Sequence, residues 1–102
     1  MDGKVFNLTI YKELKRLEKI EDDYRKKINL MDMIQLLDEV VKFQSHRQET
    51  GGNQTLAMMI IGRTLYREIS KKATTVEMRI LSNSYLKYVE FEIESFINKL
   101  KS

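Results

Sequence analysis

Few side chains of this 102-residue chain are of the kinds that catalyse reactions. Cysteine is absent, and His46 is the single histidine. It stands beside Arg47 near the polar end of a predicted helix, where a histidine commonly serves as a solvated group or a partner of the helix dipole. Gly51-Gly52 is not followed by the Gly-Lys-Ser/Thr element of a phosphate-binding loop. The sequence therefore predicts that the protein is not an enzyme.

Acidic residues are plentiful, but their spacing is not that of metal ligands. Carboxylate metal sites in helical bundles combine inward Glu residues with Glu-x-x-His, a pattern that this sequence lacks. Glu90, Glu92 and Glu94 alternate around one predicted helix instead of converging on one face. We expect these carboxylates to be solvated, and we expect no metal and no cofactor.

A row of basic residues is the strongest sign of a nucleic-acid partner. Arg63, Arg67 and Lys71 follow at four-residue steps and would stand along one helix face, which Lys72 and Arg79 could extend. Such a row could neutralise phosphates, with forked hydrogen bonds from the arginines. A solvated helix face is the competing interpretation, since no recognised nucleic-acid motif accompanies the charges. Nucleic-acid binding is therefore kept as the alternative function.

Apolar side chains point instead to a protein partner. Six methionines offer adaptable contact surfaces, and the aromatic residues of the last predicted helix resemble interface anchors. The apolar circumference of the second and fourth predicted helices exceeds what a bundle of this size can bury. The residues expected at the interface are Met33, Leu36, Phe43, Tyr85, Tyr88, Phe91 and Phe96. We therefore expect a small regulator or assembly subunit that self-associates, as a homodimer, or docks on another protein.

Helices must position all of these side chains, because proline is absent and only four glycines punctuate the chain. After a tail of residues 1–6, the first helix is predicted to begin near Asn7 or Thr9 and to end at about Ile28, with Phe6 and Tyr11 forming a staple. Its apolar stripe consists of Ile10, Leu14, Leu17, Ile20, Tyr24 and Ile28. The three- and four-residue spacing of this stripe is typical of an amphipathic helix.

The second helix is predicted from a capping pattern. Asn29 followed by Asp32 resembles an N-terminal cap with an acidic residue in the first turn, so this helix would begin there and end near Gln48. One continuous helix running through Asn29 is the alternative.

Two further helices follow a glycine-rich turn at residues 49–54. Asn53 or Thr55 can cap a third helix, whose opening residues 56–61 are apolar all round and are therefore expected at the centre of the core. This helix would end near Lys71 and Lys72. Thr74 and Glu77 match a capping box for a fourth helix, which would reach about Leu100 and be the longest.

Together these patterns predict an all-α fold, a small antiparallel bundle of about four helices in one domain spanning residues 1–102. No apolar run approaches the roughly 20 residues that a membrane helix requires, and the N-terminal residues lack the pattern of a signal peptide. A chain without cysteine also suits a reducing compartment. We therefore expect a cytoplasmic protein without a membrane partner.

Overall fold

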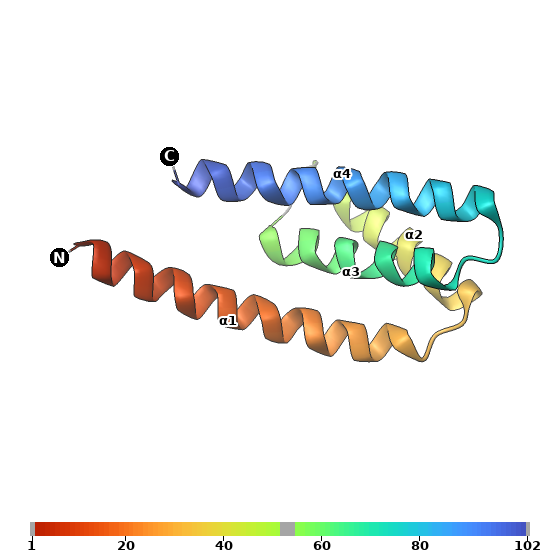
Figure 1. The fold of residues 1–102 in the computed structure, drawn as a ribbon, viewed down its shortest axis with the longest axis horizontal. Coiled ribbons are helices and arrows are strands. Elements are labelled where there is room, and N and C mark those ends of the chain that lie inside the picture. Colours follow the sequence, from red (N-terminus) through yellow and green to blue (C-terminus); the bar gives the residue numbers. More distant parts are fainter. Residues whose placement is uncertain (1, 52–54, 102) are drawn as a thin grey trace.

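The computed structural model describes residues 2–51 and 55–101, and these ranges contain four α-helices and no strand (Figure 1). The helices are α1 (Asp2–Asn29), α2 (Met33–Glu49), α3 (Leu56–Lys72) and α4 (Val76–Lys101). The predicted all-α class and the four-helix organisation are thus confirmed. No helix in the described ranges combines the length and the hydropathy that crossing a bilayer would require.

The four helices form an antiparallel bundle with α3 in the middle. In Figure 1, α3 lies between α1 and α4, and α2 crosses behind α3. Consecutive helices run in opposite directions. Contacts join α3 to each of the other three helices. Both α1 and α4 continue past the first turn of α3, so the two ends of the chain lie at the same end of a body measuring 53 × 26 × 25 Å (Figure 1).

The core gathers around α3, as its apolar opening predicted. Met59 and Ile60 are buried, and their neighbours in the first two turns are partly buried. The buried hydrophobic cluster comprises Leu17, Ile28, Leu36, Phe43, Met59, Ile60, Leu65, Tyr66, Ile69, Val89 and Ile93. Every helix contributes to this cluster, so its burial holds all four together.

Gly62 explains how closely α2 packs on α3. A Cβ atom at this position would lie 2.5 Å from Cζ of Phe43, well inside van der Waals contact. Glycine costs about 1 kcal/mol relative to alanine inside a helix. The missing side chain lets the Phe43 ring rest directly against the α3 backbone.

The structure separates the first two helices and places the cap of α2 at Asp32 rather than at Asn29. Asn29 is the last residue of α1, so the continuous-helix alternative is wrong. The Asp32 carboxylate accepts from the Gln35 amide at 2.9 Å, and the Gln35 side chain accepts from the Asp32 amide at 3.0 Å. This reciprocal pair is a capping box one turn later than the sequence suggested.

Threonines cap the other two helices. The Thr55 hydroxyl accepts from the Met58 amide at the start of α3, so Thr55, one of the two predicted caps, caps this helix. The other predicted cap, Asn53, lies outside the described residues. At α4 the hydroxyl of Thr75, not of Thr74, accepts from the Met78 amide at 3.2 Å. The cap therefore lies one residue later than predicted, and Thr74 and Glu77 do not form the predicted box.

The first helix is longer than predicted. It begins at Asp2, so residues 2–6 are helical rather than a tail. As a result α1 reaches 28 residues, while the long C-terminal helix has 26. The predicted staple of Phe6 on Tyr11 falls outside the side chains that the structure describes.

Candidate protein-interaction surface

The basic residues predicted to contact nucleic acid mostly pair within the chain. Arg63 is three-quarters buried, and its Nη2 lies 3.3 Å from Oε2 of Glu21 on α1. Arg67 lies between the same carboxylate, at 3.9 Å, and that of Glu90 on α4, at 3.6 Å. These two arginines therefore link α3 to both of the helices beside it.

The rest of the row separates into different environments. Nζ of Lys72 donates to the carbonyl oxygens of Asn29 and Met31, each at 2.8 Å, and pairs with the buried carboxylate of Glu68 at 3.1 Å. Lys71 and Arg79 are exposed. The five residues therefore do not form one row of solvent-facing cations.

Histidine and carboxylates do not cluster at metal-binding distance in the described ranges. His46 lies exposed in the last turn of α2, the position in which the sequence placed it. Among residues 2–51 and 55–101, no three His, Asp or Glu side chains gather closely enough to hold a metal ion.

The buried carboxylate of Glu39 joins α2 to α1. The Tyr24 hydroxyl donates to Oε1 of Glu39 at 3.1 Å, and the ammonium groups of Lys27 and Lys42 each lie 3.5 Å from the same carboxylate. Burial raises the pKa of the Tyr24 hydroxyl, and the neighbouring Glu39 charge raises it further. A hollow of about 210 Å³ adjoins this cluster. Because Tyr24 and Lys27 belong to α1 and Glu39 belongs to α2, the cluster fastens α1 to α2.

Two of the predicted interface residues are core residues instead. Leu36 is fully buried and Phe43 is 4% exposed, because the side of α2 that carries them packs on α3. They cannot contact a partner of the folded chain. Met33 and Phe96 are partly buried.

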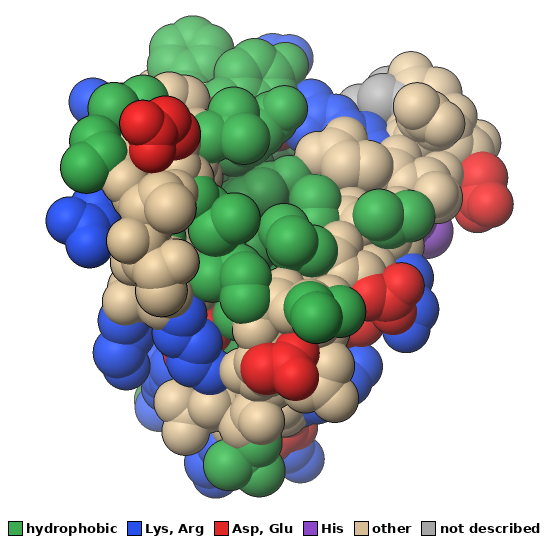
Figure 2. Space-filling view, turned by 90° about the vertical axis from the view of Figure 1, so that its right-hand side faces the viewer, with side chains coloured by type: hydrophobic (Ala, Val, Ile, Leu, Met, Phe, Trp, Pro, Cys, Tyr) green, Lys and Arg blue, Asp and Glu red, His purple; other side chains and the backbone are tan. Residues whose placement is uncertain are grey.

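The other predicted interface residues are open to solvent on α4. Tyr85, Tyr88 and Phe91 are 46%, 54% and 66% exposed. Large exposed aliphatic side chains that the sequence did not single out lie on the same two helices, among them Leu81 on α4, which lines a hollow with Tyr85 and Tyr88, and Leu37 and Val41 on α2. Figure 2 shows hydrophobic side chains collected over the end of the bundle where α4 begins and running between α4 and α2. The exposed apolar side chains of these two helices form the α2–α4 surface, which comprises Leu37, Val41, Leu81, Tyr85, Tyr88 and Phe91.

A hollow of about 360 Å³ lies between α2 and α4. Its lining residues are Gln44, Arg47, Leu81, Ser84, Tyr85 and Tyr88. The Tyr85 ring stacks on buried Tyr66 at 5.3 Å between centroids, and Nε2 of Gln44 donates to the Tyr66 hydroxyl at 2.8 Å. Tyr85 is thus held in place from the core side by Tyr66, so this part of the surface is ordered before a partner binds.

Arg47 clamps α2 to α4 beside this hollow. Its two terminal nitrogens lie 3.0 and 2.9 Å from the two carboxylate oxygens of Glu92, a bidentate pair. Its guanidinium carbon is 5.1 Å from the centroid of the Tyr88 ring. Less than a fifth of either charged side chain is exposed. The clamp neutralises its own charges and fixes the orientation of Tyr88.

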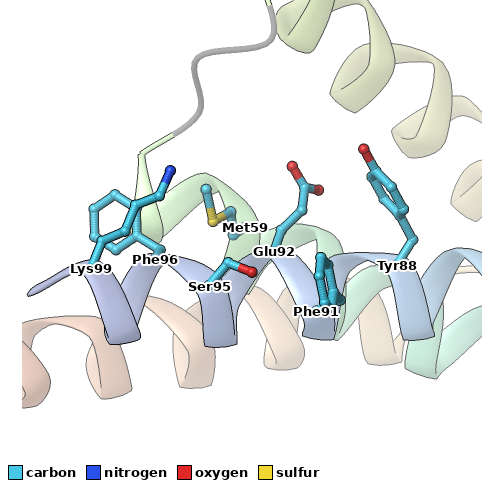
Figure 3. A pocket seen from close by; sticks show the side chains of 7 residues that line it. All are labelled: Met59, Tyr88, Phe91, Glu92, Ser95, Phe96 and Lys99. Carbon is cyan, nitrogen blue, oxygen red and sulfur yellow. The ribbon is translucent and has the colours of Figure 1, made fainter. Parts of the chain in front are cut away.

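A second hollow, of about 260 Å³, continues along α4 from Tyr88 (Figure 3). Its lining residues are Met59, Tyr88, Phe91, Glu92, Ser95, Phe96 and Lys99. All of these except Met59 belong to α4, and Tyr88 and Glu92 project to the same side of that helix (Figure 3). Because Tyr88 lines both hollows, the depression follows α4 over several turns.

Comparisons with known proteins give no match to a family model, to a curated protein or to a solved structure. The function is therefore inferred from the chemistry of the surface.

Proposed function

We propose that this chain is a non-catalytic protein-interaction module whose α2–α4 surface is covered by another polypeptide. One observation carries the proposal, the gathering of exposed aromatic and aliphatic side chains over two adjacent helices. An aromatic side chain presents roughly 200 Å² when fully exposed, so Tyr85, Tyr88 and Phe91 alone present about 300 Å² of mostly apolar area. Soluble monomers rarely leave apolar patches much larger than this in contact with water.

The composition of the surface also supports binding of a protein. Tyrosine and arginine are among the residues that contribute most to binding energy when a partner excludes water from them. Here Tyr85 and Tyr88 are held in place by Tyr66 and Arg47, so little side-chain entropy is lost when a partner arrives. Gln44 and Ser84 supply polar groups at the edge of the apolar centre. A cytoplasmic regulator or assembly subunit is the role that we propose.

Nucleic-acid binding has less support. A phosphate-binding row needs free cations that neutralise phosphates and so release the counterions bound to the nucleic acid, but Arg63, Arg67 and Lys72 already pair with carboxylates of the chain. Breaking those pairs to contact phosphate would leave Glu21 and the buried Glu68 without their cations. No other observation favours this function.

Oxidative footprinting tests the proposal without knowledge of the partner. Hydroxyl radicals oxidise exposed aromatic side chains, so the oxidation rates of Tyr88 and Phe91 are compared between the dilute purified chain and the chain in extract of its native cells. We expect oxidation in the extract to be several-fold slower at both residues, because a bound polypeptide removes them from water.

Tyr11 is the internal control, since it is 56% exposed on α1, away from this surface. Its rate should be the same in both samples. The variant Leu81→Glu should restore fast oxidation of Tyr88 in extract by placing a charge inside the contact. Equal protection of Tyr11, Tyr88 and Phe91, or no protection of any of them, would sink the proposal.

A further inference from the structure

We propose that the outer side of α1 binds the surface of an anionic membrane through a row of lysines. This lysine row consists of Lys12, Lys15, Lys19 and Lys26, and Leu8 continues its line toward the N-terminus. Steps of three, four and seven residues place all five side chains on one side of a helix. This side of α1 is separate from the α2–α4 surface, so its binding does not depend on the function proposed above.

The lysine row faces away from the rest of the bundle. Leu17 and Ile28 belong to the buried core, and each lies two residues from a lysine of the row, a rotation of about 200° around the helix. In Figure 1, α3 lies on one side of α1 and no helix lies on the opposite side. Lys12 and Lys26 are about 21 Å apart along the helix axis. A flat surface can therefore contact the whole row at once.

The charge of the lysine row is not neutralised by its own chain. All four lysines are exposed, and none of them has an ion-pair partner among the described side chains. Asp22 lies in line with the row but pairs with Arg25. The exposed carboxylates of Glu18 and Asp23 lie toward the flanks, about 60–80° from the centre of the row. The outer side of α1 is thus a line of free ammonium groups.

Apolar side chains at the end of the lysine row favour a lipid surface over other polyanions. Leu8 is 55% exposed and Tyr11 beside it is 56% exposed. Nζ of Lys15 lies 5.5 Å from the centroid of the Tyr11 ring. At a bilayer, ammonium groups attract the lipid phosphates while leucine and tyrosine side chains enter the boundary between headgroups and acyl chains. The phosphate backbone of a nucleic acid offers a leucine no such apolar contact.

Binding of this kind takes place at the membrane surface. The expectation of no membrane partner considers only segments that span a bilayer, and a helix that lies on the surface needs no spanning segment. The cytoplasmic leaflet is anionic, which suits a cytoplasmic protein with a row of free lysines. Because the lysine row faces away from α3, a bound membrane leaves the α2–α4 surface open to its partner.

Co-sedimentation of the purified chain with lipid vesicles tests this proposal. We expect binding to vesicles of mixed phosphatidylserine and phosphatidylcholine, weakening as salt rises, and no binding to phosphatidylcholine alone. The double substitution Lys15→Glu with Lys19→Glu should weaken binding by about tenfold or more. Lys71→Glu with Lys87→Glu reverses two exposed charges on α3 and α4 and is the matched control. It should weaken binding by less than about threefold, because charges farther from the membrane than a Debye length are screened.

A fluorescent probe shows which side of the molecule meets the bilayer. The chain contains no tryptophan, so Leu8→Trp and Leu81→Trp each introduce a single one, at the end of the lysine row and on the α2–α4 surface. With phosphatidylserine vesicles, the emission of the Leu8→Trp variant should shift to shorter wavelength as the indole leaves water. The emission of the Leu81→Trp variant should not change. Extract for the footprinting is cleared of membranes, so that Tyr11 stays exposed there as its control requires.

Each contrary outcome overturns the lysine row as a membrane-binding side. These outcomes are no binding to phosphatidylserine vesicles, equal binding to both kinds of vesicle, equal losses in the two double variants, and an emission shift for Leu81→Trp in place of Leu8→Trp. Circular dichroism checks that every variant keeps its helices. Retention on duplex DNA or RNA through the same lysines, without binding to vesicles, would assign the row to a nucleic acid instead.

Discussion

At Gly62 the absence of a side chain determines how two helices meet. Alanine at this position would gain about 1 kcal/mol of helix propensity, but its Cβ would meet the Phe43 ring at 2.5 Å. The ring is 4% exposed and belongs to the buried core, so although it borders the hollow beside Glu39, moving it away from residue 62 breaks contacts with the core. We expect Gly62→Ala to lower the free energy of unfolding by about 1–3 kcal/mol. Urea-induced unfolding followed by circular dichroism measures this change.

A smaller residue at position 43 is the matched control. In a Phe43→Leu background the space facing residue 62 is less crowded, so Gly62→Ala should cost less there than in the original chain. The difference between the two costs is the coupling energy of a double-mutant cycle. If Gly62→Ala stabilised the original chain, the close contact would not govern this position.

The choice of which apolar residues face the core could not be made from single residues. Leu36 and Leu37 are adjacent in the sequence and equally apolar, yet the first is fully buried and the second is 42% exposed. Their side chains point about 100° apart around α2. Only the position of α3 decides between them, and no local pattern encodes that position. For this reason the sequence predicts exposure of Leu36 and Phe43, which are buried, and does not single out Leu37 and Val41, which are exposed.

At the scale of helices, the turn between α1 and α2 depends on a side chain from α3. Lys72 donates to the carbonyl oxygen of Asn29, the last residue of α1, which a helix C-terminus leaves unpaired, and to that of Met31 in the turn before α2. The same ammonium balances Glu68, which is 6% exposed. One lysine thus fixes three helices relative to one another.

Replacing Lys72 tests this role. Lys72→Met keeps much of the side chain's length but removes its charge and its donors, leaving the Glu68 carboxylate buried without a counter-charge. We expect the free energy of unfolding to fall by about 2–4 kcal/mol. Thermal and urea unfolding at neutral pH measure the loss.

The second substitution Glu68→Gln should recover part of that loss, since a neutral amide costs less to bury than an isolated carboxylate. Lys71→Met, at an exposed neighbouring position, is the control and should change stability by less than about 0.5 kcal/mol. Equal effects of the Lys71 and Lys72 substitutions would show that the tether contributes nothing.

The presence and order of the helices could be predicted from the periodicity of apolar residues. The first residues of the observed helices differ from the predicted ones by one to several positions. Two consecutive threonines precede α4, and both offer a hydroxyl three residues before a backbone amide. The chain path selects Thr75. Asn29 and Asp32 offered a similar choice at α2, where the reciprocal bond with Gln35 favours Asp32. The ion pairs of the basic row could not be predicted for a related reason, since Glu21 and Glu90, which pair with Arg67, are distant in sequence.

At the scale of the whole molecule, the body is longer than a compact chain of this length. Its radius of gyration is 15.2 Å, against about 13 Å expected for a compact domain of 100 residues. The cause is visible in Figure 1, where α1 and α4 extend beyond α3. Along α1, Leu17 is 3% exposed but Leu14 is 50% exposed, which marks where coverage by the rest of the bundle ends.

This boundary predicts uneven stability within one helix. Amides of α1 before Leu14 should exchange with solvent at least tenfold faster than those between Leu17 and Ile28, because fewer buried contacts must break to open them. Hydrogen exchange resolved by mass spectrometry on peptides from each half provides the measurement. Uniform protection along α1 would mean that the exposed half is covered by something other than the described bundle.

The first turn of α1 and the last turn of α4 lie at the same end of the bundle, and this arrangement has a mechanical consequence (Figure 1). A force pulling the ends apart would act across the helices rather than along them. It would peel α1 and α4 from α3 turn by turn, starting at the end where they project, so few contacts would bear the load at any moment.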